Sequence, residues 1–413
     1  MFYIRPAKIE DGETLLKLAK MVHFINLPAD KSIIDDKISR SRGCFRRAAE
    51  GDYSRPEAPQ LPSEMAGLSS STASTNLYMF VLEDTDSPGC LGTCQLIASM
   101  GGPGAPNVSF KLERRELYST SLKFGSTQVV AQMYLDESSP TEIGGLILQP
   151  SLRGHPARLG KFLSIVRFHF IALHRAGFAD EILAEMMGPT SPDGQNLFWD
   201  YLGRRFIPLS YPEADRFCQH SREFMVALMP KGEVYLSLLP PEARSVIGEV
   251  GAETVPARRM LEKLGFRYQQ FIDPFDGGPN LRAKTDEVPI VRDTRIARVG
   301  ACVPGSRARL AGITSSMTAD GDFRAVQEPV AIDGAGNVCL TAQTAELLGV
   351  RPGDRVGFTP TDAKSRAAME KARAQLAVPK SKRHTGGEVG AALHLPDEPA
   401  KKTKKRARKK AGA

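Results

Sequence analysis

The stretch from Glu142 to Lys161 constrains the fold more than any other part of this sequence. It reads as an apolar strand over residues 143–148, then a basic turn containing glycine, then a helix from about Ala157 to Ala176. A strand followed by a long helix with one buried face requires a sheet on which the helix packs, which indicates an α+β body. The residues of the buried stripe are Leu159, Phe162, Leu163, Val166 and Phe170.

The turn between this strand and this helix has the chemistry of a pyrophosphate site. Free N–H groups at a helix N-terminus attract anions, and basic side chains add charge. Glycines inside the strand suggest a bulge or a close approach by a ligand, whose extended arm could hydrogen-bond to the backbone. These features suit coenzyme A; the alternative is an ordinary connection with surface arginines. The candidate binding residues are Leu148, Arg153, Gly154, Arg158, Gly160 and Lys161.

Competing phosphate and metal motifs are not satisfied. Five residues separate Gly154 from Gly160, and Lys161 is followed by Phe162, so the segment is not a P-loop. The six cysteines are scattered, and no histidines have the HExxH spacing. We therefore predict no bound metal.

Composition divides the chain into a body, a second region and a tail. Residues 1–287 mix strand and helix patterns, interrupted at 50–76 by a stretch rich in Pro, Ser, Glu and Thr that we interpret as a mobile insertion. Residues 288–362 contain short β-rich pieces separated by turns, which predicts a small β-barrel subdomain. Residues 363–413 are rich in Lys and Arg and are predicted to be disordered.

The positive charge of the chain is concentrated in that tail. The formal net charge is +8, but the tail contributes +11 and residues 1–362 sum to −3. Basicity therefore does not make the body a nucleic-acid-binding domain. The tail itself either touches nucleic acid or is a solvated, solubilising segment. No signal peptide and no run of about 18 apolar residues is recognised, so we expect a cytoplasmic protein without membrane contact.

Several stretches, taken in order, point to a known family. The most specific is Ile272-Asp273-Pro274-Phe275-Asp276-Gly277-Gly278-Pro279. The others include Phe80–Asp84, Ala184–Met186, Leu202–Phe206, Leu228–Lys231, Pro256–Arg258 and Gly265–Tyr268. With these stretches the chain resembles the arginine N-succinyltransferases, which are GNAT-type acyl-CoA N-acyltransferases. The resemblance runs from Met1 to about Asp362 and omits the insertion.

This resemblance implies a GNAT-like fold with a C-terminal β-subdomain. It implies transfer of a succinyl group from succinyl-CoA, a co-substrate and not a permanently bound cofactor, to the α-amine of arginine in arginine breakdown. The family assigns succinyl-CoA binding to a strand leucine, which falls on Leu146 here. Members of the family can assemble from more than one subunit, so a homo- or hetero-oligomer is also possible by resemblance.

The sequence departs from the family at two histidine positions. The family's proton-donor histidine falls on Gly251, and a second histidine of an Asp-His-Thr-Gly stretch is lost where this chain reads Asp136-Glu137-Ser138-Ser139. Three explanations stay open: the proton-transfer role has moved, the acceptor differs, or catalysis is weak. A non-catalytic acyl-CoA-binding protein is the alternative function.

Carboxylates are the candidates to replace the missing groups. Glu137, Glu142 and Glu185 are candidates to accept or relay the proton of the attacking amine. Asp136, with Glu137, is a candidate to hold a guanidinium by bidentate contact. Backbone N–H groups near Leu146 would polarise the thioester carbonyl. For each carboxylate, a solvated or structural role is the alternative.

Overall fold

The computed structural model describes residues 1–21, 27–56, 75–191, 193–218 and 222–377 of the 413-residue chain. Most of the expected 50–76 insertion and residues 378–413 of the basic tail lie outside the described residues. No helix within the described ranges combines the length and the apolar character that a membrane crossing would need.

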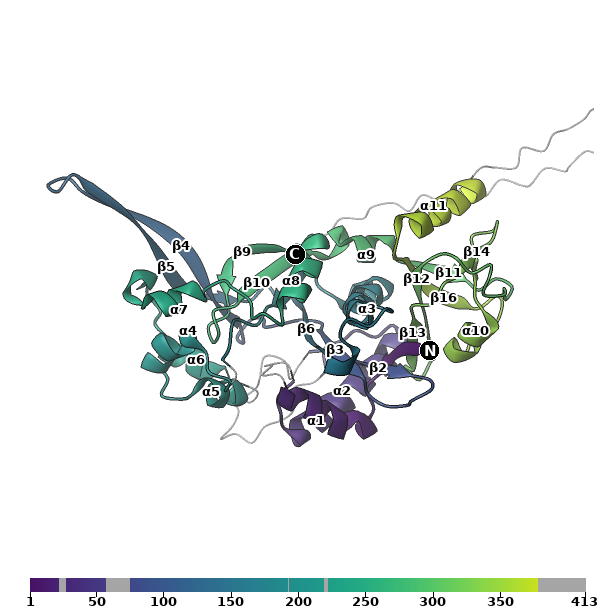
Figure 1. The fold of residues 1–413 in the computed structure, drawn as a ribbon, viewed down its shortest axis with the longest axis horizontal. Coiled ribbons are helices and arrows are strands. Elements are labelled where there is room, and N and C mark those ends of the chain that lie inside the picture. Colours follow the sequence, from purple (N-terminus) through teal and green to yellow (C-terminus); the bar gives the residue numbers. More distant parts are fainter. Residues whose placement is uncertain (22–26, 57–74, 192, 219–221, 378–413) are drawn as a thin grey trace, which may run out of the picture. The chain divides into compact units, whose positions relative to one another are not determined.

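One long mixed sheet organises residues 1–376 (Figure 1). Its strand order is β11-β16-β12-β13-β1-β2-β3-β6-β7-β10-β9-β4-β5-β8. Among the described strands, β6 and β7 form the one parallel pair of this sheet. The central strands are β1 (Phe2–Pro6), β2 (Leu77–Asp84), β3 (Gly92–Ile97), β6 (Thr141–Leu148), β7 (Glu181–Glu185), β10 (Pro279–Lys284) and β9 (Arg267–Ile272).

The sheet continues on both sides of these strands. On one side, a hairpin of two 13-residue strands extends away from the sheet and is followed by a short strand (Figure 1). These strands are β4 (Asn107–Ser119), β5 (Phe124–Asp136) and β8 (Val234–Tyr235). On the other side lie β13 (Phe323–Val326), β12 (Gly312–Met317), β16 (Arg355–Pro360) and β11 (Arg295–Arg298). A separate pair joins β14 (Ala331–Ile332) to β15 (Val338–Cys339).

Helices pack on the sheet and fill the connections. The longer helices are α1 (Gly12–Met21), α2 (Lys31–Glu50), α3 (Leu159–Leu173), α8 (Val255–Lys263) and α11 (Ala363–Ala377). The shorter ones are α4 (Leu197–Tyr201), α5 (Tyr211–Phe217), α6 (Glu223–Leu228), α7 (Pro241–Ser245), α9 (Pro289–Asp293) and α10 (Ala342–Leu348). Single 3₁₀ turns lie at Ile9–Asp11, Pro150–Leu152, Arg175–Gly177, Gly203–Arg205, Leu236–Leu238 and Thr285–Glu287.

The two faces of the central sheet have different partners. On what we call the α3 face, α3 packs against alternate strand residues such as Phe80, Leu96 and Ile143, together with Phe45 from the second half of α2. On what we call the α1 face, α1 and the first half of α2 pack against the intervening residues, including Ile97. This division follows from the period-2 alternation of side chains along a strand.

The observed elements confirm the α+β body and the strand–turn–helix segment. The expected strand at residues 143–148 lies within β6, and the expected helix is α3. The barrel expected at residues 288–362 is not formed, because β12, β13 and β16 join the main sheet through the pairing of Tyr3 with Val326. The expected tail also begins too early, since α11 is helical and its Arg366 contacts Asp293 at 2.6 Å.

Candidate functional site

The pairing between β6 and β7 stops well before β6 ends, and we call the unpaired stretch between the two strands the slot. The two strands pair only at Thr141 with Ile182 and at Glu142 with Leu183, among the described residues. Beyond this point β6 continues to Leu148, while β7 ends at Glu185. Separating parallel strands leave backbone groups without a strand partner on the side of the slot, where a ligand arm can hydrogen-bond to them.

A β-bulge shapes the β6 wall of this slot. The pairing of β6 with β3 shifts register between Thr93–Ile147 and Gln95–Gly144, so β6 carries one extra residue. Gly145 accommodates the bulge with a φ of +57°, a left-handed conformation that favours glycine. A Cβ on Gly145 would also lie 2.8 Å from Nε2 of Gln95, so a side chain is excluded for two reasons.

The turn after β6 presents basic groups beside an uncapped helix end. Arg158 precedes α3 in a left-handed conformation, with a φ of +51°, and α3 has no side-chain cap. The side chains of Arg158 and Lys161 are exposed. Arg153 reaches across to the segment before α8, where its Nη1 lies 2.5 Å from Oε2 of Glu253. Uncapped N–H groups next to exposed cations are suited to binding an anion at this end of the slot.

The α1 face of the same strands is polar and buried. Glu142 is 1% exposed and interacts electrostatically with Lys37 of α2, which is itself buried. At the end of β7, Oε1 of Glu185 accepts a hydrogen bond of 2.8 Å from Nδ2 of Asn107. The side-chain amide oxygen of Asn107 in turn accepts a hydrogen bond of 2.6 Å from the Arg222 guanidinium. Acidic and basic groups are therefore held together on this face, where Glu142 and Lys37 are buried and Glu185 and Arg222 are partly exposed.

Burial changes the ionisation of this polar group. Burial lowers the pKa of Lys37 to about 8, assisted by Arg40 and partly opposed by Glu142. Burial, together with the negative charge of Asp276, raises the pKa of Asp215 on α5 to about 7. Burial alone would lower the pKa of Arg222, but neighbouring acids led by Glu185 raise it. Lys37 and Asp215 therefore both have pKa values near neutral pH, which is typical of functional sites.

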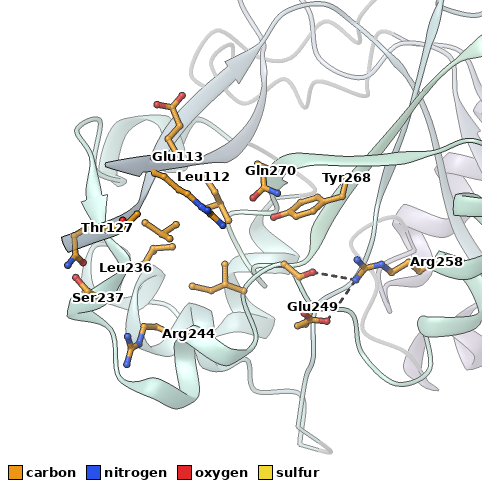
Figure 2. A pocket seen from close by; sticks show the side chains of 15 residues that line it. Leu112, Glu113, Thr127, Leu236, Ser237, Arg244, Glu249, Arg258, Tyr268 and Gln270 are labelled. Atoms are coloured by element: carbon orange, nitrogen blue, oxygen red, sulfur yellow. Dashed lines mark hydrogen bonds and ion pairs between the residues drawn. The ribbon is translucent and has the colours of Figure 1, made fainter. Parts of the chain in front are cut away.

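The described surface also has a hollow of about 500 Å³ at a different place (Figure 2). It lies between the β4–β5 hairpin, β9, α8 and residues 236–249, and Figure 2 shows Tyr268 and Gln270 at its upper edge. An ion pair of 3.9 Å between Arg258 and Glu249 borders it. None of its lining residues belongs to β6 or β7, so the hollow is separate from the slot.

Comparison with known proteins agrees with this geometry. The family model "Arginine N-succinyltransferase beta subunit" matches residues 62–290, and the model of its C-terminal domain matches residues 316–360. Arginine N-succinyltransferases of Citrobacter koseri and Escherichia coli are 31% and 30% identical to the chain, and each alignment covers 89% of it and 100% of the relative. The chain belongs to the arginine N-succinyltransferase family.

A solved structure supports the same conclusion at the level of the fold. The arginine/ornithine succinyltransferase subunit AI from Pseudomonas aeruginosa matches with a TM-score of 0.69 and 26% identity, over 88% of this chain and 99% of that one. The predicted GNAT-like α+β fold is confirmed. In this arginine N-succinyltransferase fold, Leu146 lies half-buried in the β6 wall of the slot and packs against the α3 core.

The departure from the family at Gly251 lies at the end of β7. The Gly251 N–H donates a 3.1 Å hydrogen bond to the Met187 carbonyl. A Cβ at this glycine would lie 3.3 Å from the Gly188 carbonyl oxygen, so a larger residue requires only a small adjustment. The position to which the resemblance assigns the family's histidine therefore lies close to the end of β7.

The family run Ile272–Pro279 fastens this region. The Asp276 carboxylate accepts hydrogen bonds from the N–H groups of Gly188 (2.9 Å) and Gly278 (2.7 Å). Asn196 donates to the Asp276 carbonyl at 3.1 Å. Burial raises the pKa of Asp276 to about 6, against the effect of these N–H donors. The run acts as a clamp that holds the segment following β7.

The structure brings some predicted site residues together and separates others. Glu142 and Glu185 share the α1 face. Asp136 is buried and contacts Arg282 at 2.5 Å; burial opposes its ionisation, but Ser138 and Arg282 outweigh this and lower its pKa. Glu137 is exposed and accepts a hydrogen bond from the Gly104 N–H at 3.2 Å. The guanidinium-binding role expected of Asp136 is thus already met by a side chain of the protein.

Sequence reasoning missed several residues of the polar face. Lys37 occupies a core-facing position of α2, between Ile34 and Ser41, where a charged residue stands out from the helical pattern. Gln95 is a polar residue inside the otherwise apolar centre of β3. A charged or amide side chain at a position that the pattern predicts to be buried was the signal that could have found both.

Proposed function

We propose that this protein transfers a succinyl group from succinyl-CoA to the α-amine of arginine by direct transfer. The observation that carries the proposal is the slot between β6 and β7, which has an anion-binding helix end on one side and a buried polar face on the other. The relatives, which align over 89% of this chain, are named for this activity.

The chain's own groups suit each part of this reaction. The pyrophosphate of succinyl-CoA is assigned to the N-terminus of α3, with Arg153, Arg158 and Lys161 beside it. The pantetheine arm runs along the β6 wall, including Leu146 and Leu148. Backbone N–H groups at the bulge stabilise the oxyanion that forms when the amine nitrogen attacks the thioester carbon. The carbon–sulfur bond then breaks and the thiolate leaves.

Glu142 is the carboxylate best placed to receive the proton of the amine. It precedes the bulge by two residues on the α1 face, and the neighbouring Lys37 has a pKa of about 8, suited to passing that proton onward. The proton finally returns to the coenzyme A thiolate, which completes the balance of the reaction. Glu137 lies outside this face at an exposed position, and Oε1 of Glu185 is held by Asn107.

The glycine at position 251 favours a second candidate function. Without an imidazole beside the end of β7, the leaving thiolate lacks the family's proton donor. A protein that binds acyl-CoA but turns over slowly or not at all fits this observation. Since the Pseudomonas aeruginosa neighbour is described as a subunit, such a chain would also fit a hetero-oligomer with a more active partner.

Release of free thiol from succinyl-CoA tests the choice between these functions. Purified protein is incubated with succinyl-CoA and with arginine, ornithine or other amines, and coenzyme A binding is measured in parallel by calorimetry. Thiol release with arginine supports the proposal. Binding of coenzyme A without thiol release for any amine supports the second function, and release with only a different amine replaces arginine as the acceptor.

The variant Gly251→His sharpens this test. We expect about a tenfold or greater rise in kcat, because a positioned acid typically contributes more than this to proton transfer. Ala252→His is the matched control, since it adds the same side chain one exposed position further along. An equal change in both variants, or none in either, would argue against a proton-donor site at position 251.

A further inference from the structure

Four residues form a row across the α1 face of the sheet. Gln95 of β3 pairs with Gly144 of β6, and Glu185 of β7 pairs with Asn280 of β10. Glu142 pairs with Leu183 in parallel register. Gly144 and Glu185 each lie two residues further along their strands, so they are level with one another. Directly paired residues project from the same face, so Gln95, Gly144, Glu185 and Asn280 follow one another at the mouth of the slot.

The two ends of this row are buried amides without partners. Gln95 is 0% exposed and Asn280 is 1% exposed. Neither the nitrogen nor the oxygen of either side-chain amide has a hydrogen-bond partner. A buried amide without partners destabilises a protein by about 1–3 kcal/mol for each unpaired group, so its presence requires a reason. A polar ligand that supplies the missing partners is such a reason.

The middle of the row has one position without a side chain and two positions that are partly exposed. Gly144 has no side chain and is partly exposed, although both its β3 neighbour and the following Gly145 are buried. Glu185 is also partly exposed and uses Oε1 for Asn107. Near the thioester the row therefore has Gly144, which lacks a side chain. Further along it has the Glu185 carboxylate beside the Asn280 amide.

We infer that this row holds the two ends of the acceptor amino acid. The amide N–H₂ of Gln95 donates to the α-carboxylate, which places the neighbouring α-amine over Gly144 beside the bulge. The carboxylate of Glu185 and the amide oxygen of Asn280 accept hydrogen bonds from the guanidinium. This inference rests on the proposed function, because the acceptor that it describes is arginine.

The dimensions of the row match this acceptor. Paired strands are about 4.8 Å apart, and β6 and β7 are no longer paired at Gly144 and Glu185, so three strand spacings separate Gln95 from Asn280 by at least about 14 Å. A hydrogen bond of about 3 Å at each end leaves at least about 8 Å, which an extended arginine can span. A shorter amino acid would reach the α-carboxylate site or the guanidinium site, but not both. The row thus selects for length as well as for charge.

Two variants separate the two ends. Gln95→Leu removes the carboxylate contact, so the KM for arginine rises about 10- to 100-fold, as expected for a lost hydrogen bond to a charged group. Turnover of agmatine, which lacks the α-carboxylate, stays as in the wild type. Asn280→Leu gives the opposite pattern: arginine is affected to a similar extent and norvaline, which lacks the guanidinium, is not. Gln132→Leu, at an exposed position of β5, is the matched control.

A binding measurement keeps this test independent of turnover. Calorimetric titration of arginine into each variant, with coenzyme A present, reports the acceptor site even if no thiol is released. Arginine binding that both variants weaken, with the expected selectivity for agmatine and norvaline, supports the row whether or not transfer occurs. Wild-type protein that binds no arginine overturns the inference, as does wild-type affinity in both folded variants. Asn280→Ala replaces Asn280→Leu if the larger side chain prevents folding.

Discussion

The two faces of the central sheet are formed by the same strands but carry side chains of opposite chemistry. On the α3 face, Phe170 is fully buried and its ring centroid lies within about 5.5 Å of those of Phe45, Tyr78, Phe80 and Phe323. On the α1 face, near the slot, carboxylates, cations and unpartnered amides take the place of such rings. The difference indicates that the α3 face supplies stability, whereas the α1 face gives up stability to keep polar groups ready for a ligand.

The largest expected effect tests the α3 face. Phe170→Ala removes the ring at the centre of the aromatic cluster, and we expect the free energy of unfolding to fall by about 3–5 kcal/mol, as for other buried aromatic residues. Chemical denaturation followed by circular dichroism measures this. The folded fraction should keep its KM for arginine. A loss below about 1 kcal/mol would show that the cluster isn't the main source of stability.

The next effect tests the chemistry of the α1 face. Glu142→Gln keeps the shape of the side chain but removes the proton acceptor, so we expect kcat to fall by about 10²- to 10⁴-fold. The melting temperature and coenzyme A affinity should change little, and steady-state thiol release provides the rate. Glu137→Gln, at the exposed position, is the control. An unchanged kcat in Glu142→Gln would move the proton-transfer role to another group.

The acid sensitivity of the α3 face comes from His169. This buried histidine connects α3 to β12 and β16, with Nε2 2.6 Å from Oγ of Ser315 and Nδ1 2.5 Å from Oγ1 of Thr359. Burial lowers its pKa to about 3, so the unfolded chain binds more protons between about pH 3 and 6.5. Stability therefore falls as the pH drops through this window, by about 1.4 kcal/mol per pKa unit at most.

His169→Gln keeps polar contacts at this site but does not titrate. Denaturant midpoints measured from pH 7 to pH 4 should fall less steeply for this variant than for the wild type. His155→Gln, in the turn after β6, is the control because it changes a histidine outside the α3 core. Parallel curves for His169→Gln and the wild type would mean that His169 is not what makes the fold acid-sensitive.

The smallest expected effect concerns Asp215, which interacts electrostatically with Lys37 of the α1 face. Its pH dependence has the opposite sign to that of His169. Asp215 has a pKa raised to about 7 from the ordinary 3.8, so the folded protein binds the extra proton between these values. Its contribution to stability consequently falls as the pH rises from about 4 to 7. Asp215→Asn should gain up to about 1–2 kcal/mol relative to the wild type at pH 8 and nothing at pH 4. A gain that is equal at both pH values would assign the effect to something other than ionisation.

Local patterns explain how much of the fold was predictable. The segment from Glu142 to Lys161 was recognised because its strand, glycine turn and apolar helix stripe are properties of neighbouring residues. The expected barrel at residues 288–362 was wrong because strand pairing depends on residues that are far apart in the chain. Turn and strand patterns indicate that strands exist, but the pairing of Tyr3 with Val326 depends on packing across the whole chain.

The candidate site divides in the same way. The basic turn and the carboxylates Glu142 and Glu185 were visible in the sequence, and the structure places both carboxylates on one face. The competing contact between Asp136 and Arg282 was not visible, since those residues are far apart in the chain. A carboxylate is available to a ligand only if no arginine of the protein lies close enough to bind it, and the sequence does not show which side chains lie close together.

The sequence by itself determined the family and the strand–turn–helix segment, because these depend on residue identity and order. Only the tertiary structure decided that Gln95, Gly144, Glu185 and Asn280 lie in one row. The physical reason is strand register. Hydrogen bonding between backbones sets which residues of distant strands lie side by side, and burial then determines which of their polar groups lack a partner.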